Sequence, residues 1–274
     1  MTSHWLTAIR GSVPRSAAAA LGLVPVVIVL LLWGLFTRGA PESRVVGPTI
    51  LPSPPEVVES LQDLLATQDS DNRSLFDHIG ISLRRVGLGF VLALAVVLPL
   101  GILMGSFGSA RALFQPAMTA SGYIPIATLV PLTMSWFGLD EIQKVVFLGM
   151  AFAIFLLPAV VTAIDAVPEV YLRTAYTLGA GRFQVIRKVL VPVAAPDIWH
   201  SMRLAFGIGW TYLVLAEVVV KAGGLGDMID TARRRAMSGR VYLVIVIITV
   251  IAWVSDLLWQ QLGHLFFPYR RSRS

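Results

Sequence analysis

RTAYTLGAGRFQVIRKVLVP, residues 173–192, is a polar and basic stretch that lies between long apolar runs. Four uncharged apolar runs precede it and two weaker ones follow it. A run of roughly 20 apolar residues can cross the about 30 Å of hydrocarbon in a bilayer as a helix. We therefore expect the stretch to be an exposed loop within a bundle of membrane-spanning helices.

The six runs predict an all-α membrane protein with six transmembrane helices. Glu217 interrupts one of the weaker runs and Asp256 the other, and acids at this depth are tolerated when they face protein or water. No A-x-A cleavage site follows the first run, so we expect it to stay as an anchor. The strong runs are Ala17–Phe36, Val86–Ala110, Ala112–Leu139 and Val145–Ile164, and the weaker ones are Leu204–Val220 and Val241–Gly263.

The composition favours a bilayer protein and excludes several other classes. Of 274 residues, 56% are hydrophobic and 14% are charged, whereas roughly a quarter are charged in soluble domains. The net charge of +6 does not indicate nucleic acid, because the basic residues are not interleaved with stacking aromatics. With no cysteine and four distant histidines, we expect no metal site. No lysine is followed by Ser or Thr as in a Walker A loop, so we expect no ATP hydrolysis by that route.

Glycine and proline define the predicted shape of the 173–192 stretch. Gly179 comes four residues after Ala175, and it offers the left-handed conformation with which a short helix over Tyr171–Leu178 can end. Pro192 and Pro196 are expected to end a second helix that leads back to the bilayer. The alternative is an ordinary basic loop that touches lipid phosphates. Its basic residues would be Arg182, Arg187 and Lys188.

The spacing resembles the loop by which permease subunits of ATP-binding-cassette (ABC) importers engage their ATPase. That loop reads Glu-Ala-Ala, three residues, Gly, nine residues, Ile-x-Leu-Pro, and here Arg173 stands where the family has its acid. Three further blocks, in the family's order, resemble permeases of the nitrate/sulfonate/taurine type. They are LPSPPEVVESL at 51–61, YIPIATLVPLTMSWFG at 123–138 and LAEVVVKAGGLGDMI at 215–229, and the resemblance covers residues 48 to 268.

The resemblance implies a type I importer permease: five core helices after one extra helix, in the bacterial inner membrane. It implies a homodimer, cytoplasmic ATPase subunits that hold the ATP and Mg²⁺, and a periplasmic solute-binding protein that delivers a small, often anionic solute. This chain would bind no cofactor itself, and its sequence does not name the solute. The residues implied to meet the ATPase are Arg173, Ala175, Tyr176, Leu178, Gly179, Ala180, Gly181 and Arg182.

This topology gives four predicted segments. Residues 1–37 would be a cytoplasmic N-terminus and the first helix, 38–85 a periplasmic segment, 86–268 the core with a cytoplasmic loop at 165–203, and 269–274 a cytoplasmic tail. Eleven of the 22 Lys and Arg residues would lie inside, so charge does not decide the orientation, which rests on the ATPase contact. From Pro55 onward, EVVESLQDLL predicts an amphipathic helix within the periplasmic segment.

Proline also marks a candidate translocation path. Pro125 and Pro131 each remove a backbone hydrogen bond, and non-helical backbone at membrane depth is tolerated where it is buried or faces a water-filled path. We expect Tyr123–Trp136 to line the path, and the alternative is a kinked packing helix. The candidate residues are Tyr123, Pro125, Thr128, Pro131, Thr133, Ser135 and Glu217.

The charged residues leave alternatives open. Glu217 has a role in transport or, instead, reaches the interface or pairs with Arg233–Arg235. Those arginines and Arg240 attract an anionic solute or a binding protein, or contact lipid headgroups. A second class of function is an ion-coupled secondary transporter with Glu217 or Asp256 as the coupling carboxylate, although no internal duplication supports it. A hydrolase built on Ser201 and a neighbouring histidine is a third, and no Gly-flanked serine supports it.

Overall fold

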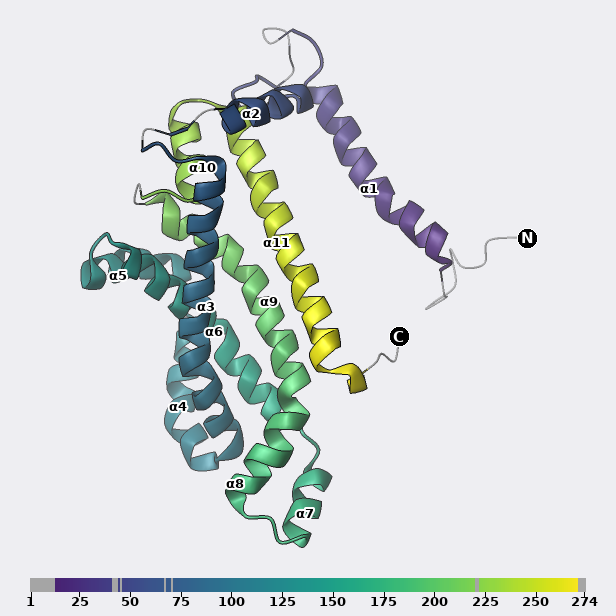
Figure 1. Ribbon diagram of the computed structural model, residues 1–274, viewed down its shortest axis with the longest axis vertical. Coiled ribbons are helices and arrows are strands. Elements are labelled where there is room, and N and C mark those ends of the chain that lie inside the picture. Colours follow the sequence, from purple (N-terminus) through teal and green to yellow (C-terminus); the bar gives the residue numbers. More distant parts are fainter. Residues whose placement is uncertain are drawn as a thin grey trace. The chain divides into compact units, whose positions relative to one another are not determined.

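The computed structural model describes residues 13–40, 44, 46–66, 68–69, 71–219 and 222–270. These residues form helices and connecting segments, with no strand among them (Figure 1). They fall into two compact units. The first takes in the described residues up to 66 together with Ala232–Leu243, and the second takes in those from Gln68 to Thr231 and from Val244 onward. The predicted all-α class is confirmed.

The first unit contains α1 (Arg15–Phe36), α2 (Pro54–Ala66) and the first turns of α11 (Ser238–Phe266). α2 lies where the sequence predicts an amphipathic helix, and it buries Val57 and Leu64. It begins at two prolines, which suits the first turn of a helix because the missing N–H groups would have no partner there.

The second unit is built on α3 (Leu75–Ser106), α6 (Glu141–Asp165) and α9 (Val191–Val218), which pack against one another (Figure 1). Glycine permits the close approach of α3 and α6. A Cβ atom at Gly101 would lie 2.6 Å from Cγ1 of Val160. Gly105 completes a G-x-x-x-G pair with Gly101, and a Cβ atom there would lie 2.6 Å from Cβ of Ile164 in α6. The pair therefore serves packing within the chain.

Three aromatic rings fill the centre of this unit. The Phe90 ring of α3 meets the Phe152 ring of α6 and the Phe206 ring of α9 edge to face, each with ring centroids 5.1 Å apart. Edge-to-face contact brings a ring's positive edge to a neighbour's negative face, which stabilises the pair beyond the area it buries. The aromatic rings thus hold the three helices in register.

The apolar run predicted over Ala112–Leu139 is sharply bent in the structure. α4 (Gly108–Ser121) is followed by a 3-10 turn (Ile126–Thr128) and α5 (Leu129–Phe137), and the two helical parts are bent by 89°. The intervening residues contain Pro125, which cannot donate a helical hydrogen bond. The interruption predicted at Pro125 is therefore confirmed, and the structure adds the angle between the two parts.

Within the part of the chain that the structure describes, four helices are long and apolar enough to cross a membrane, and a fifth span results if the bent pair is one crossing. The four are Ser16–Phe36, Leu75–Ser106, Glu141–Asp165 and Ser238–Phe266. The remaining predicted run lies in α9, which is 28 residues long and less apolar because it contains charged residues. The other elements are α7 (Glu169–Thr177), α8 (Arg182–Val185), a π-helical turn (Ile186–Leu190), α10 (Leu225–Arg234) and a 3-10 turn (Pro268–Arg270).

Candidate coupling loop, translocation path and buried ion pairs

The predicted corner at Gly179 is present, at the end of α7. Gly179 has φ +80°, in the left-handed region that favours glycine. Its N–H donates to the Tyr176 carbonyl at 2.9 Å, and the Ala180 N–H donates to the Ala175 carbonyl at 3.0 Å. These two bonds form a Schellman motif, which satisfies carbonyls that the helix end leaves without partners. The corner is therefore specified by the backbone.

Large apolar side chains project from this corner. Leu178 is 81% exposed, Phe183 is 72% exposed and Tyr176 is 51% exposed. Single exposed apolar residues are common on proteins, but a group of them on a hydrogen-bonded turn is typical of a contact surface. The structure thus brings the predicted coupling residues together in one exposed corner.

Arg173, at the position of the family's acid, forms an ion pair with Glu169 one turn earlier on α7. Both side chains are largely exposed, so the pair contributes little to stability. α7 therefore carries a carboxylate close to the position where the family's acid is missing.

The chain after the corner departs from the prediction for Pro192 and Pro196, which do not end a helix. α8, the π-helical turn and α9 follow one another without a break, with Pro192 in the first turn of α9 and Pro196 inside it. In the π-helical turn the Val191 N–H donates to the Ile186 carbonyl, five residues back. This wider turn accommodates the missing N–H of Pro192 without ending the helix.

Most of the predicted path residues lie on the outside of the bent segment. Tyr123 is 83% exposed, and Thr128, Pro131 and Ser135, spaced three and four residues apart, are exposed on one face of α5 and the turn before it. Pro125 is exposed in the bend itself. This face therefore carries the hydroxyl groups of Thr128 and Ser135 on either side of Pro131.

Thr133 is the exception within α5, because it is fully buried. Its hydroxyl lies 2.8 Å from the Leu129 carbonyl, to which it donates, and it accepts a hydrogen bond of 2.9 Å from Nε2 of Gln143 in α6. These bonds tie α5 to α6. The position of Thr133 favours a packing contact over contact with a solute.

Glu217 lies apart from that face and is fully buried at the end of α9. Its partner is Arg85 of α3, whose Nη1 lies 2.7 Å from Oε1, and the Ser82 hydroxyl donates to the same carboxylate at 2.9 Å. The expectation that Glu217 reaches the interface or pairs with Arg233–Arg235 was therefore wrong. Desolvation explains the choice, because a buried acid needs a buried charge partner.

Arg85 joins three helices through one side chain that is 1% exposed. Besides Glu217 of α9, its guanidinium contacts both carboxylate oxygens of Glu141 in α6, with Nε 2.8 Å from Oε2. Nζ of Lys144 lies 3.5 Å from the same Glu141. Because the Arg guanidinium is a planar fork, it can hold two carboxylates at once. The sequence pointed to Glu217 but missed Arg85, Glu141 and Lys144 as its neighbours.

Asp256 of α11 is likewise paired, with Arg203 of α9. Nε of Arg203 lies 2.5 Å from Oδ1 and Nη2 lies 2.9 Å from Oδ2, and Gln260 donates to the same carboxylate. Both acids that interrupt the weaker apolar runs thus meet an arginine from another helix. Each carboxylate is stabilised by an oppositely charged partner within the protein.

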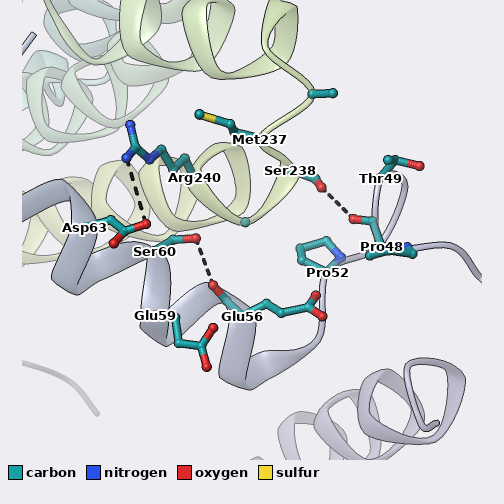
Figure 2. Close-up of a pocket in the computed structure, with 12 residues that line it drawn as sticks. Pro48, Thr49, Pro52, Glu56, Glu59, Ser60, Asp63, Met237, Ser238 and Arg240 are labelled. Atoms are coloured by element: carbon teal, nitrogen blue, oxygen red, sulfur yellow. Dashed lines mark hydrogen bonds and ion pairs between the residues drawn. The ribbon is translucent and has the colours of Figure 1, made fainter. Parts of the chain in front are cut away.

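The first unit has a polar pocket of about 430 Å³ between α2 and the start of α11 (Figure 2). The Ser238 hydroxyl donates to the Pro48 carbonyl at 2.6 Å, and Arg240 faces Asp63 at 4.0 Å. At the start of α2 the Ser53 N–H donates to Glu56, which holds the pKa of that carboxyl below its ordinary value. No group of three or more His, Asp or Glu side chains suited to a metal ion occurs among the described residues.

Long apolar helices, whose acids Glu217 and Asp256 each pair with an arginine from another helix, define a membrane-spanning helical protein. Residues 97–266 match the model of the binding-protein-dependent transport system inner membrane component. The chain belongs to this family, and it is a permease subunit of an ABC importer and a multi-pass inner-membrane protein.

Relatives of this chain include permeases with named solutes. It is 28% identical to the taurine transport system permease protein TauC of Escherichia coli (strain K12), over 93% of this chain and 92% of the relative. It is 26% identical to the nitrate import permease protein NrtB of Synechocystis sp., over 89% and 88%. With a putative ABC transporter permease of Methanocaldococcus jannaschii the identity is 33%, over 82% and 84%.

The fold is similar to that of solved importers. A structure of the MetNI methionine ABC transporter in an inward-facing conformation matches with a TM-score of 0.63 at 19% identity, over 70% of this chain and 95% of that chain. An amino acid ABC transporter matches with a TM-score of 0.56 at 16% identity, over 76% and 95%. At these identities the likeness concerns the fold, which is the type I importer permease fold.

Proposed function

We propose that two copies of this chain form the translocation path for a small anionic solute of the taurine, sulfonate, nitrate or bicarbonate kind. A periplasmic binding protein delivers the solute, and two cytoplasmic ATPase subunits, which hold the ATP and Mg²⁺, drive the cycle. The class of solute rests on the relatives, which include a taurine permease and a nitrate permease. In the proposed orientation the N-terminus and α7 lie in the cytoplasm.

The exposed corner at the end of α7 is the observation that carries this proposal. Its backbone is fixed by two hydrogen bonds while Leu178 and Phe183 stay exposed, so the corner is stiff and apolar at once. A contact that transmits force has to be stiff, and one that binds a protein groove gains from burying apolar surface. Tyr171–Leu178 with Gly179 is accordingly proposed as the coupling helix.

Reconstitution tests the proposal. The chain is placed in liposomes with and without a candidate ATPase subunit, and uptake of labelled taurine, an alkanesulfonate, nitrate and bicarbonate is measured with the purified binding protein outside. We expect uptake of at least one of these anions that requires both the ATPase and ATP. Uptake by the chain alone under an ion gradient would show that the proposal is wrong.

The structure gives little support to the two other classes of function. Glu217 and Asp256 are each held by an arginine, so neither carboxylate is left open to a coupling ion. The Ser201 hydroxyl donates to the Asp197 carbonyl of its own helix at 3.0 Å, as a packing serine does.

A further inference from the structure

One face of α3 carries three buried polar side chains in its first turns. His78, Ser82 and Arg85 are spaced four and three residues apart and are 3%, 0% and 1% exposed. Polar groups buried in this way cost free energy unless they find hydrogen-bond partners. The groups that these side chains bind therefore indicate the structural role of this face of α3.

The partners are backbone groups of the segment 222–226, here called the outer loop, which joins α9 to α10. Every residue of the outer loop is held through its main chain, and α3 supplies the partner for four of the five. The contacts are Arg85 Nη2 to the Ala222 carbonyl (3.0 Å), Arg85 Nη1 to the Gly223 carbonyl (2.6 Å), the Gly224 N–H to Nδ1 of His78 (3.0 Å), the Leu225 N–H to Oγ of Ser82 (2.8 Å) and the Gly226 N–H to Oε2 of Glu217 (2.8 Å).

Glycine lets the outer loop close around the Glu217 carboxylate. Gly224 has φ +108°, and a Cβ there would lie 2.3 Å from Oε1 of Glu217. At Gly226 a Cβ would lie 2.7 Å from Cβ of the same residue. Any side chain at these two positions would displace the acid from Arg85. The conformation of the outer loop, the position of the Glu217 carboxylate and the polar face of α3 therefore depend on one another.

The same set reaches beyond the loop at both ends. Nε2 of His78 lies 3.2 Å from Oδ2 of Asp69, just before α3, and Arg85 continues to Glu141 at the start of α6. One polar chain thus joins the ends of α3, α6 and α9 with the start of α10. The outermost members meet water, since the side chains of Asp69 and Glu141 are 31% and 55% exposed, whereas four of the five bonds to the outer loop are buried. Buried hydrogen bonds rigidify a structure, because no water replaces a partner that moves away.

We propose that His78, Ser82 and Arg85 are positioning residues for transport. They fix the outer loop to α3, so that the ends of α3, α6 and α9 and the start of α10 move as one body when the pathway opens and closes. The inference that these helix ends move together during transport rests on the proposed function, whereas the inference that α3 holds the outer loop does not. The polar attachment runs through the backbone of the outer loop, and the fully buried side chain of Leu225 adds an apolar contact.

Spin-label distance measurements on the full chain in lipid nanodiscs test the proposal. Because the chain has no cysteine, Leu83→Cys in α3 and Thr231→Cys in α10 provide the only labelling sites. We expect one narrow distance distribution for the parent, and loss of that narrow distribution in Arg85→Met and His78→Leu. His78→Asn should restore it, because its Oδ1 can accept the Gly224 N–H in place of Nδ1.

Matched controls separate positioning from general loosening. Arg84→Met changes the exposed neighbour of Arg85 and should leave the distribution narrow. A second label pair within α3 and α6, Val91→Cys with Phe155→Cys, should be unaffected by Arg85→Met. Equal broadening of both pairs would overturn the proposal. If Arg85→Met does not fold, Ser82→Ala removes a single hydroxyl, and an unchanged distribution in both Ser82→Ala and His78→Leu overturns it as well.

The transport cycle adds a separate comparison with the ATPase bound. We expect the 83–231 distance of the parent to be the same without nucleotide and in the vanadate-trapped state, and a shift between these states would show that the loop moves independently of α3. If no ATPase binds the chain, the proposed function fails. The variants in the chain alone still decide whether α3 holds the loop.

Discussion

Replacement of Gly179 by alanine perturbs the coupling corner in the smallest possible way. The residue has φ +80°, and a Cβ built there meets no atom within 4 Å. Steric clash therefore adds nothing, and the substitution isolates the cost of the left-handed backbone. Gly181, two residues on, is the matched control, because its φ is −74° and its nearest atom would be 4.0 Å away.

The magnitude follows from the backbone conformation. A left-handed residue other than glycine costs about 1–2 kcal/mol, and alanine regains about 0.4–1 kcal/mol by restricting the alternative conformations of the chain. The net loss of roughly 1 kcal/mol lowers the equilibrium constant for forming the corner about fivefold, since 1.4 kcal/mol is tenfold. The apparent Kd for the ATPase rises by at most this factor, because only the fraction of the chain with the corner formed binds.

Titration of the ATPase onto the nanodisc-embedded chain measures this effect. We expect Gly179→Ala to weaken binding by up to about fivefold. Gly181→Ala adds the same methyl group without backbone strain and should weaken binding less, because its conformation suits alanine. If both variants bind as tightly as the parent, the corner does not present the ATPase contact. If both weaken binding equally, the left-handed backbone is not the cause.

Three further predictions concern the buried ion pair of Arg85, the contact between α3 and α6, and the Glu56 carboxylate at the start of α2. Arg85→Met leaves its acid partner buried and unpaired, which should lower the free energy of unfolding by about 3–5 kcal/mol, whereas Arg84→Met should change it by less than about 0.5 kcal/mol; reversible unfolding in detergent measures both. Gly101→Ala places a Cβ 2.6 Å from a valine of α6 and should cost about 1–3 kcal/mol in the same assay. Because the Ser53 N–H lowers the pKa of Glu56 from 4.5, the stabilisation of α2 is present above that pH and is lost as the pH falls through the folded-state pKa. Hydrogen exchange of the α2 amides should show this loss as reduced protection at low pH. In Glu56→Gln the protection of α2 should no longer depend on pH in this range.

The apolar runs predicted most of the fold because hydrocarbon imposes a length and a composition on each span. The corner at Gly179 was predictable too, since glycine has a local reason to be there. The 89° bend was not. Pro125 shows where a helix must break, but the angle between the two parts depends on what each packs against. At Pro192 local rules predict the end of a helix, but the helix continues because a π-helical turn accommodates the proline.

Arg85 was missed because the sequence places it at the edge of an apolar run, where a basic residue ordinarily meets water or lipid headgroups. The signal that would have found it is the spacing of His78, Ser82 and Arg85, which puts three polar residues on one face of the helix that continues into the run. Their partner segment contains two adjacent glycines more than a hundred positions away. Only the folded chain shows that these two features meet.

The absence of the family's acid from the proposed coupling helix can be explained from α7 itself. Glu169 pairs with Arg173 across one turn, and the two side chains are 76% and 80% exposed. Such an exposed pair is weakly held, so a partner with complementary charges can replace either half of it at little cost. The apolar contact of Leu178 has no such substitute, because its exposed surface is lost from water only when a groove covers it. In this chain, therefore, Leu178→Ala should weaken ATPase binding more than Arg173→Ala does in the titration, and the opposite order would show that charge at position 173 governs the contact.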